Sequence, residues 1–302
     1  MPHKGKKFTD HCYKRSFPAV RTDLAAELDL TDRDGVDERT ETRSGFGVST
    51  IRIRTKAAAE RLGKPTGEYI TIDIGKIWLE GDERVSAAAG IIAGKLARLA
   101  EEMCGEIPER ILIAGLGNRH ITADALGDEV VGMITVTRHV KANRELFGLL
   151  GGREISAIAP GVLGETGIET AKLVAGAVRA AKPQIVVAVD ALAARSTDRL
   201  ATTVQLGSSG ISPGSGIGGR RLAINEETLG VPVIALGVPT VVDSSTLVTD
   251  ALEKAGMTGI PEELRHVLES GRSFFVTPKE TDTIIKELAE LSARAITLAF
   301  SG

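Results

Sequence analysis

Short apolar runs alternate with helical patterns along most of this chain. Four aliphatic runs lack the apolar–polar alternation of half-exposed strands, as expected for strands covered on both faces: 111–114, 155–159, 185–189 and 231–236. Helical patterns lie between or after them, around 124–140, 167–181, 243–256 and 279–299. This rhythm predicts an α/β fold with a mostly parallel sheet flanked by helices.

The region before residue 82 has a different pattern. Residues 48–54 and 68–74 alternate apolar and polar positions, which predicts two half-exposed strands with a helical turn between them. We therefore expect a small β-containing annex at about 45–78. A helix capped by Asp82 and ended by Gly105 follows.

Net charge, cysteine count and the length of apolar runs limit the classes of function that we expect for this chain. The chain has 302 residues, a net charge of −3 and two cysteines, so neither direct nucleic-acid binding nor a disulfide framework is expected. No apolar run reaches the length of a membrane span and no secretory signal is present, which favours a cytoplasmic location. Residues 1–23 carry six Lys or Arg against two Asp and predict either a flexible tail or a removable pro-segment.

Asp124 and Asp190 are the main candidates for chemistry. Each opens an Asp-Ala-Leu segment just beyond an expected buried strand. Parallel strands converge at their carboxyl ends, so the two carboxylates could form an acid/base pair. Other interpretations remain open here: Asp124 could cap a helix or lie in its first turn, and Arg195 or Arg199 could neutralise Asp190.

Two rival functions are also compatible with the motifs. His120 could hold a metal ion together with Asp124 and Asp190, as in a metal-assisted peptidase, although a surface histidine is commoner. Gly115–Asn118 begins like a dinucleotide fingerprint, but His120 stands where the third glycine belongs. Gly214–Gly219 has the residue pattern of that fingerprint, although no long strand precedes it. These two glycine-rich loops make a nucleotide- or phosphate-binding module the second rival function.

The chain also resembles a known family, the germination proteases (spore endopeptidases) of endospore-forming bacteria. The resemblance runs from about Val20 to the C-terminus. It is carried by ordered blocks that include Arg21–Ala25, Gly115–Asn118, Asp124–Gly127, Thr137–His139, Asp190–Ser196, Pro213–Gly216, Glu227–Ala235, Pro239–Asp243 and Val276–Glu280.

This resemblance implies a single α/β peptidase domain at 24–302, with a fold similar to that of hydrogenase-maturation proteases. It implies an atypical aspartic endopeptidase, with Asp124 and Asp190 catalytic and with no metal or cofactor. It also implies a homotetramer in the spore core that degrades small acid-soluble spore proteins during germination. The enzyme would be a zymogen that removes residues 1–23 itself, because Asp23-Leu24-Ala25 matches the family's acidic–bulky apolar–alanine cleavage sequence.

Four further residues are candidates around the aspartates. Gly117 and Asn118 are expected to stabilise an oxyanion, and His120 and Arg195 to line the site. Ala123 departs from the family pattern, which has proline before the first aspartate.

Overall fold

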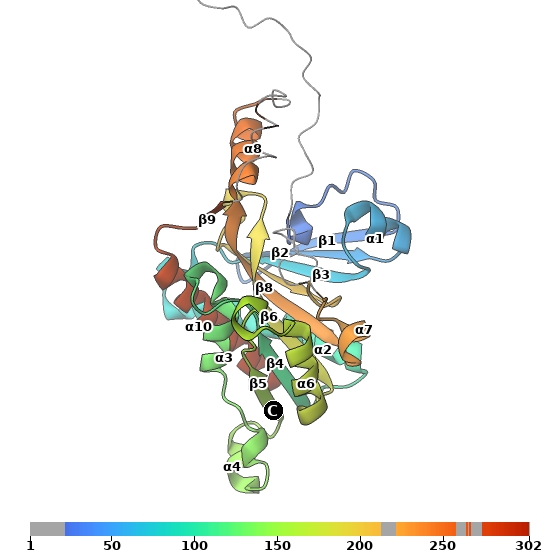
Figure 1. Cartoon of the computed structure of the whole chain (residues 1–302), viewed down its shortest axis with the longest axis vertical. Coiled ribbons are helices and arrows are strands. Elements are labelled where there is room, and N and C mark those ends of the chain that lie inside the picture. Colours follow the sequence, from blue (N-terminus) through green and yellow to red (C-terminus); the bar gives the residue numbers. More distant parts are fainter. Residues whose placement is uncertain (1–21, 213–221, 258–263, 265, 267–273, 302) are drawn as a thin grey trace, which may run out of the picture.

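In the computed structural model, which describes residues 22–212, 222–257, 264, 266 and 274–301, a single mixed sheet forms the centre of the molecule (Figure 1). Its strands follow the order β1-β2-β3-β7-β8-β6-β4-β5, and β9 pairs with β8. Their bounds are β1 Val36–Arg43, β2 Phe46–Ile53, β3 Gly67–Asp73, β4 Arg110–Gly115, β5 Glu154–Ile158, β6 Ile185–Ala194, β7 Thr203–Gly207, β8 Val233–Asp243 and β9 Phe275–Val276.

The two halves of the sheet differ in direction. Strands β8, β6, β4 and β5 are parallel, as the aliphatic runs predict. Strands β1, β2, β3 and β7 are antiparallel to their neighbours, so the sheet is mixed rather than mostly parallel. A two-residue turn, Ser44-Gly45, joins β1 to β2 with positive φ at both positions, a geometry that produces an antiparallel hairpin.

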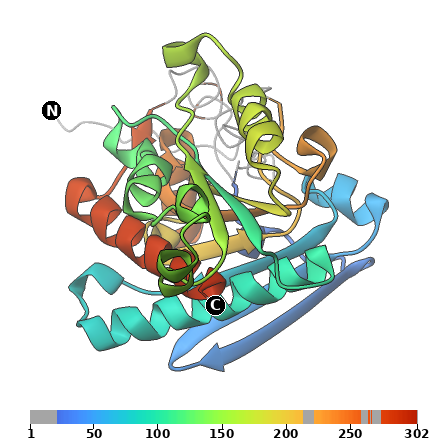
Figure 2. The ribbon, with the colours of Figure 1, turned by 90° about the horizontal axis from the view of Figure 1, so that it is seen from below.

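Helices cover both faces of the parallel half (Figure 2). Ile111 and Ile113 of β4 pack in one core with α2 (Asp82–Cys104), α3 (Leu126–Met133) and α10 (Thr281–Phe300). Leu112 and Ala114 pack on the opposite face with α6 (Thr170–Ala181). The other α-helices of the described residues include α1 Lys56–Leu62, α4 Arg144–Leu149, α5 Leu163–Thr166, α7 Glu226–Leu229 and α8 Ser244–Lys254.

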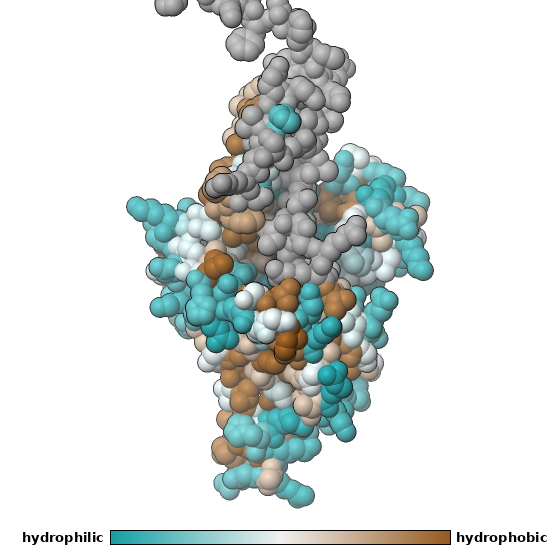
Figure 3. Space-filling model, viewed as in Figure 1, coloured by the Kyte–Doolittle hydropathy of each residue, from teal (hydrophilic) through white to brown (hydrophobic). Residues whose placement is uncertain are grey.

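The expected annex is continuous with this sheet. Its strand β3 pairs with β7, and β7 with β8, so the β-rich region joins the parallel half edge to edge. The annex also begins at β1, before the predicted start at about residue 45. Strand β1 was not predicted because it has almost no buried position and therefore shows no apolar–polar alternation. Hydrophilic side chains cover much of the β1–α1 side in the view of Figure 3.

Several helix boundaries differ from the predicted ones. Gly81, not Asp82, caps α2, whereas Gly105 ends it in the left-handed conformation as expected. The pattern at 124–140 yields only α3 and a short 3-10 turn at Arg138–Val140. In the described part of the chain, no helix combines the length and apolarity needed to cross a membrane.

Candidate active site

Asp190 lies within β6 rather than after it. The aliphatic run predicted a strand ending at Val189, but β6 continues to Ala194 because its far end pairs with β8. Asp190 is 6% exposed, and its Oδ1 accepts a hydrogen bond of 3.0 Å from the backbone N–H of Ala191. It lies beside Gly237 of β8 in the register of the sheet. The strand therefore fixes the position of a carboxylate among aliphatic neighbours.

Asp124 belongs to the connection between β4 and α3. It ends the 3-10 turn Thr122–Asp124, and its Oδ2 accepts a hydrogen bond of 2.9 Å from the backbone N–H of Asn118. Gly117 makes this approach possible: its φ is +105°, and a Cβ there would lie 1.9 Å from the Asp124 carbonyl oxygen. The helix-cap interpretation is wrong, because α3 begins at Leu126 with Ala125 at its cap.

Ala123 and Thr240 tie this connection to the sheet. Ala123 is buried, and its carbonyl oxygen accepts a 2.6 Å hydrogen bond from the Thr240 hydroxyl on β8. The turn is thus held by a side chain of another strand at the position where the family resemblance led us to expect proline. Since Thr240 is itself buried, this bond is shielded from water and restricts the turn that carries Asp124.

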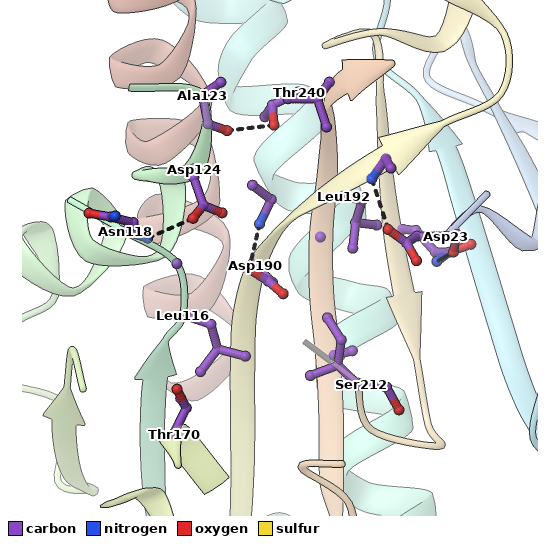
Figure 4. Close-up of a pocket in the computed structure, with 18 of the residues that line it drawn as sticks. Asp23, Leu116, Asn118, Ala123, Asp124, Thr170, Asp190, Leu192, Ser212 and Thr240 are labelled. Carbon is purple, nitrogen blue, oxygen red and sulfur yellow. Dashed lines mark hydrogen bonds between the residues drawn. The ribbon is translucent and has the colours of Figure 1, made fainter. Parts of the chain in front are cut away.

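Both aspartates line one cavity of about 680 Å³. Asp23, Gly117 and Asn118 line it too. In the close-up of Figure 4, Asp190 lies between Asp124 on one side and Asp23 on the other. The cavity therefore contains both predicted catalytic residues and the residue before the predicted cleavage point.

Comparisons with known proteins identify the family of this chain. A family model described as germination protease matches residues 19–257. The chain belongs to the germination protease family. It is 40% identical to the germination protease of Caldanaerobacter subterraneus subsp. tengcongensis, over 93% of this chain and 94% of that one. Identity is 35% to that of Clostridium acetobutylicum (93% and 95% covered) and 33% to that of Bacillus subtilis (93% of each).

Among solved structures, the chain is similar to the [NiFe] hydrogenase maturation protease HycI from Thermococcus kodakarensis KOD1. The TM-score is 0.36 and the sequence identity 19%, with 67% of this chain and 98% of that chain covered. Membership of the germination protease family supports a protease role in spore germination.

Two residues expected to line the germination protease site lie outside the cavity lining. His120 is exposed, and its Nε2 lies 3.3 Å from Glu165. The Arg195 guanidinium donates to both carboxylate oxygens of Glu253, at 2.6 and 2.8 Å. Arg199 lies 4.0 Å from Glu27. Neither arginine contact supports the salt-bridge interpretation of Asp190.

The structure adds no support for a metal site at His120 or for a nucleotide-binding site at the glycine-rich loops. Within the described ranges, no group of three or more His, Cys, Asp or Glu side chains could hold a metal ion. His120 and Asp124 do not share a helical face, because a turn and a 3-10 segment connect them. The Gly214–Gly219 match lies outside the described residues.

The cavity-lining residues that were not predicted from the sequence include Lys64 after α1, Tyr69 on β3 and Gln205 on β7. The annex and the antiparallel half of the sheet supply them. Gln205 did carry a signal, since it is the polar residue in the short apolar run Val204–Leu206, and a polar side chain in a buried strand requires a partner. Lys64 carried none, because its contacts come from distant parts of the chain.

Proposed function

We propose that this chain is an endopeptidase of the atypical aspartic type, in which Asp124 and Asp190 activate water. The observation that carries the proposal is that two carboxylates from different elements line one cavity, each with a backbone N–H as a hydrogen-bond donor. Those bonds hold the carboxylates in defined positions, which acid/base chemistry requires.

The proposed mechanism is direct attack of water on a peptide carbonyl. One carboxylate accepts a proton from the water as it attacks. The other carboxyl group, in its protonated form, donates a hydrogen bond to the carbonyl oxygen and later protonates the leaving amine. The Asn118 backbone N–H donates its hydrogen bond to Asp124 and so orients that carboxylate. Stabilisation of the oxyanion would therefore fall to other hydrogen-bond donors near Gly117.

The substrates proposed from family membership are small acid-soluble spore proteins, which the enzyme would degrade in the spore core during germination. The protein would act as a homotetramer and bind neither nucleic acid nor a membrane. It would also be a zymogen that cuts its own Asp23–Leu24 bond. Asp23 is one of the cavity-lining residues, which supports a cut close to this point.

The test is hydrolysis of a peptide containing Asp-Leu-Ala, measured together with the mass of the enzyme itself. Asp124→Asn and Asp190→Asn should each lower kcat by at least about 100-fold and leave the chain at full length. Asp282→Asn, at an exposed position in the first turn of α10, is the matched control and should retain both activities. Full peptidase activity in either cavity variant would refute the aspartate pair.

The same assay separates the proposal from a metal-assisted peptidase. We expect activity to survive prolonged treatment with a strong chelator, because the proposed chemistry needs only carboxyl groups and water. Loss of activity on chelation, with recovery on adding one divalent metal, would favour the metal-assisted mechanism instead.

A further inference from the structure

The residue before the proposed self-cleavage point is held against the strand that carries Asp190. The Asp23 N–H donates a 2.9 Å hydrogen bond to the carbonyl oxygen of Ala193, and the Asp23 Oδ2 accepts one of 2.9 Å from the Ala193 N–H. Ala193 lies on β6, just beyond Asp190. These bonds hold Asp23 at the cavity that Asp124 and Asp190 also line (Figure 4).

The residue after the cleavage point is anchored by packing. Leu24 is fully buried. Its neighbours in the core are Leu192, Ala194 and Val242. The peptide bond between Asp23 and Leu24 is therefore fixed from both of its ends.

Two side-chain donors meet at the carbonyl oxygen of this peptide bond. Lys64 Nζ and Gln205 Nε2 each donate a 2.9 Å hydrogen bond to the Asp23 carbonyl oxygen. Most hydrogen bonds to backbone carbonyls in proteins come from backbone N–H groups. Here a cation and an amide, from two elements far apart in the sequence, converge on the one carbonyl that self-processing would attack.

Each donor is itself held in place. Gln205 is buried on β7, and its Oε1 accepts a 2.6 Å hydrogen bond from the Ala25 N–H, which directs its Nε2 toward the carbonyl oxygen. Lys64 follows α1, and its Nζ lies 5.7 Å from the centre of the Tyr69 ring. Donors that are in position before the reaction stabilise a developing charge without reorganisation.

We propose that Lys64 and Gln205 stabilise the oxyanion that forms when the chain cuts its own Asp23–Leu24 bond. This rests on the proposed peptidase function. Water adds to the Asp23 carbonyl carbon, one carboxylate accepts its proton, and the C=O electron pair moves to the oxygen. The oxyanion then reforms the C=O bond as the bond to the Leu24 nitrogen breaks, and that nitrogen takes a proton from the other carboxyl group.

The two donors favour this intermediate over the uncut bond. A hydrogen bond from an ammonium or an amide strengthens when its acceptor changes from a neutral carbonyl to an anion. Away from bulk water this attraction is less screened. An oxyanion has one more lone pair than a carbonyl oxygen, so the protonated carboxyl group can donate to it as well as Lys64 and Gln205. For this one bond, the annex and β7 thus add two donors to those near Gly117.

The test follows the loss of residues 1–23 by mass spectrometry, in the full chain, from the end of a short pulse of cell-free synthesis. Lys64→Met should slow the appearance of the chain that begins at Leu24 by about 100-fold, because one oxyanion donor is lost. Lys56→Met is the matched control: Lys56 is exposed at the start of α1 and should process at the wild-type rate. A wild-type or faster rate in folded Lys64→Met overturns the proposal.

Gln205→Glu tests the second donor and keeps the question decidable if Lys64→Met does not fold. It preserves the side-chain shape and the acceptor for the Ala25 N–H, but sets a carboxylate oxygen against the Asp23 carbonyl oxygen. Processing should slow by about 100-fold or more. An unchanged rate in this variant overturns the role of Gln205.

A rescue experiment separates stabilisation of charge from filling of space. Lys64→Ala removes the ammonium and its stem from a cavity-lining position, so a small alkylammonium ion can enter. Butylammonium should speed processing of this variant by about tenfold, and butanol should not. Equal rescue by butanol overturns the proposal, because Lys64 would then only fill space.

Failure of the peptidase proposal would look different. The wild type would then leave the Asp23–Leu24 bond intact, or Asp190→Asn would cut it as fast as the wild type does. If the wild type cuts this bond, Asp190→Asn does not, and Lys64→Met cuts it at the wild-type rate, only the role of Lys64 is refuted.

Discussion

The backbone N–H of Asn118 donates a 2.9 Å hydrogen bond to the Asp124 carboxylate, six residues further along the chain. This bond links the loop that leaves β4 to one of the two proposed catalytic groups. It requires the loop to pass against the Asp124 backbone, and only a residue without Cβ fits at Gly117. The glycine at position 117, just after β4, thus allows this loop to hold a carboxylate in place.

Gly117→Ala should therefore disable the site. Its Cβ would lie 1.9 Å from the Asp124 carbonyl oxygen, at a φ of +105° that alanine rarely adopts. We expect the free energy of unfolding to fall by about 1–3 kcal/mol and kcat to fall by roughly 100-fold. Gly90→Ala on α2, where no atom lies within 4 Å of the added Cβ, should stay active and be as stable or more so. Near-normal kcat in Gly117→Ala would contradict the argument.

Thr240→Val tests the second support of the same turn. It keeps the shape of the side chain but removes the hydroxyl donor to the Ala123 carbonyl. Leaving a buried carbonyl without this bond should cost about 1–3 kcal/mol of unfolding free energy, measured by chemical denaturation. Thr240→Ser restores the hydroxyl, so kcat should recover in that variant. If kcat is the same in both variants, the bond does not position Asp124.

Glu68 should govern stability in acid. It lies opposite Arg52 across β2 and β3, accepts a 2.9 Å bond from Arg52 Nε, and also pairs with Arg98 of α2. Burial alone would raise the pKa of Glu68, but the two arginines outweigh it and hold that pKa below the ordinary 4.5. The stabilisation is therefore complete above pH 4.5 and is lost as pH falls through the lowered pKa.

Glu68→Gln measures that contribution. At pH 7 it should lower the free energy of unfolding by about 2 kcal/mol, because two arginines lose a charged partner. The difference from wild type should shrink as the pH falls below 4.5. Glu287→Gln, at an exposed position of α10, should differ little from wild type at any pH. A difference of constant size from pH 7 down to pH 3 would show that the charge of Glu68 is not the cause.

The sequence patterns predicted the parallel core and the convergence of Asp124 and Asp190, because aliphatic runs mark doubly covered strands and such strands end at one edge. They missed β1, whose two faces are both exposed. They also ended β6 too early, because its last residues owe their extended form to pairing with β8 across a bulge at Leu192/Ala193. That pairing is a tertiary interaction with no local pattern.

The contacts that Asp23 makes in the cavity could not be predicted from the sequence, for a similar reason. Lys64 and Gln205 contact Asp23 across 41 and 182 residues of sequence. Local periodicity carries no information about contacts of that separation. Family resemblance predicts Asp23 as the residue before a cut, but only the folded arrangement shows which side chains hold it.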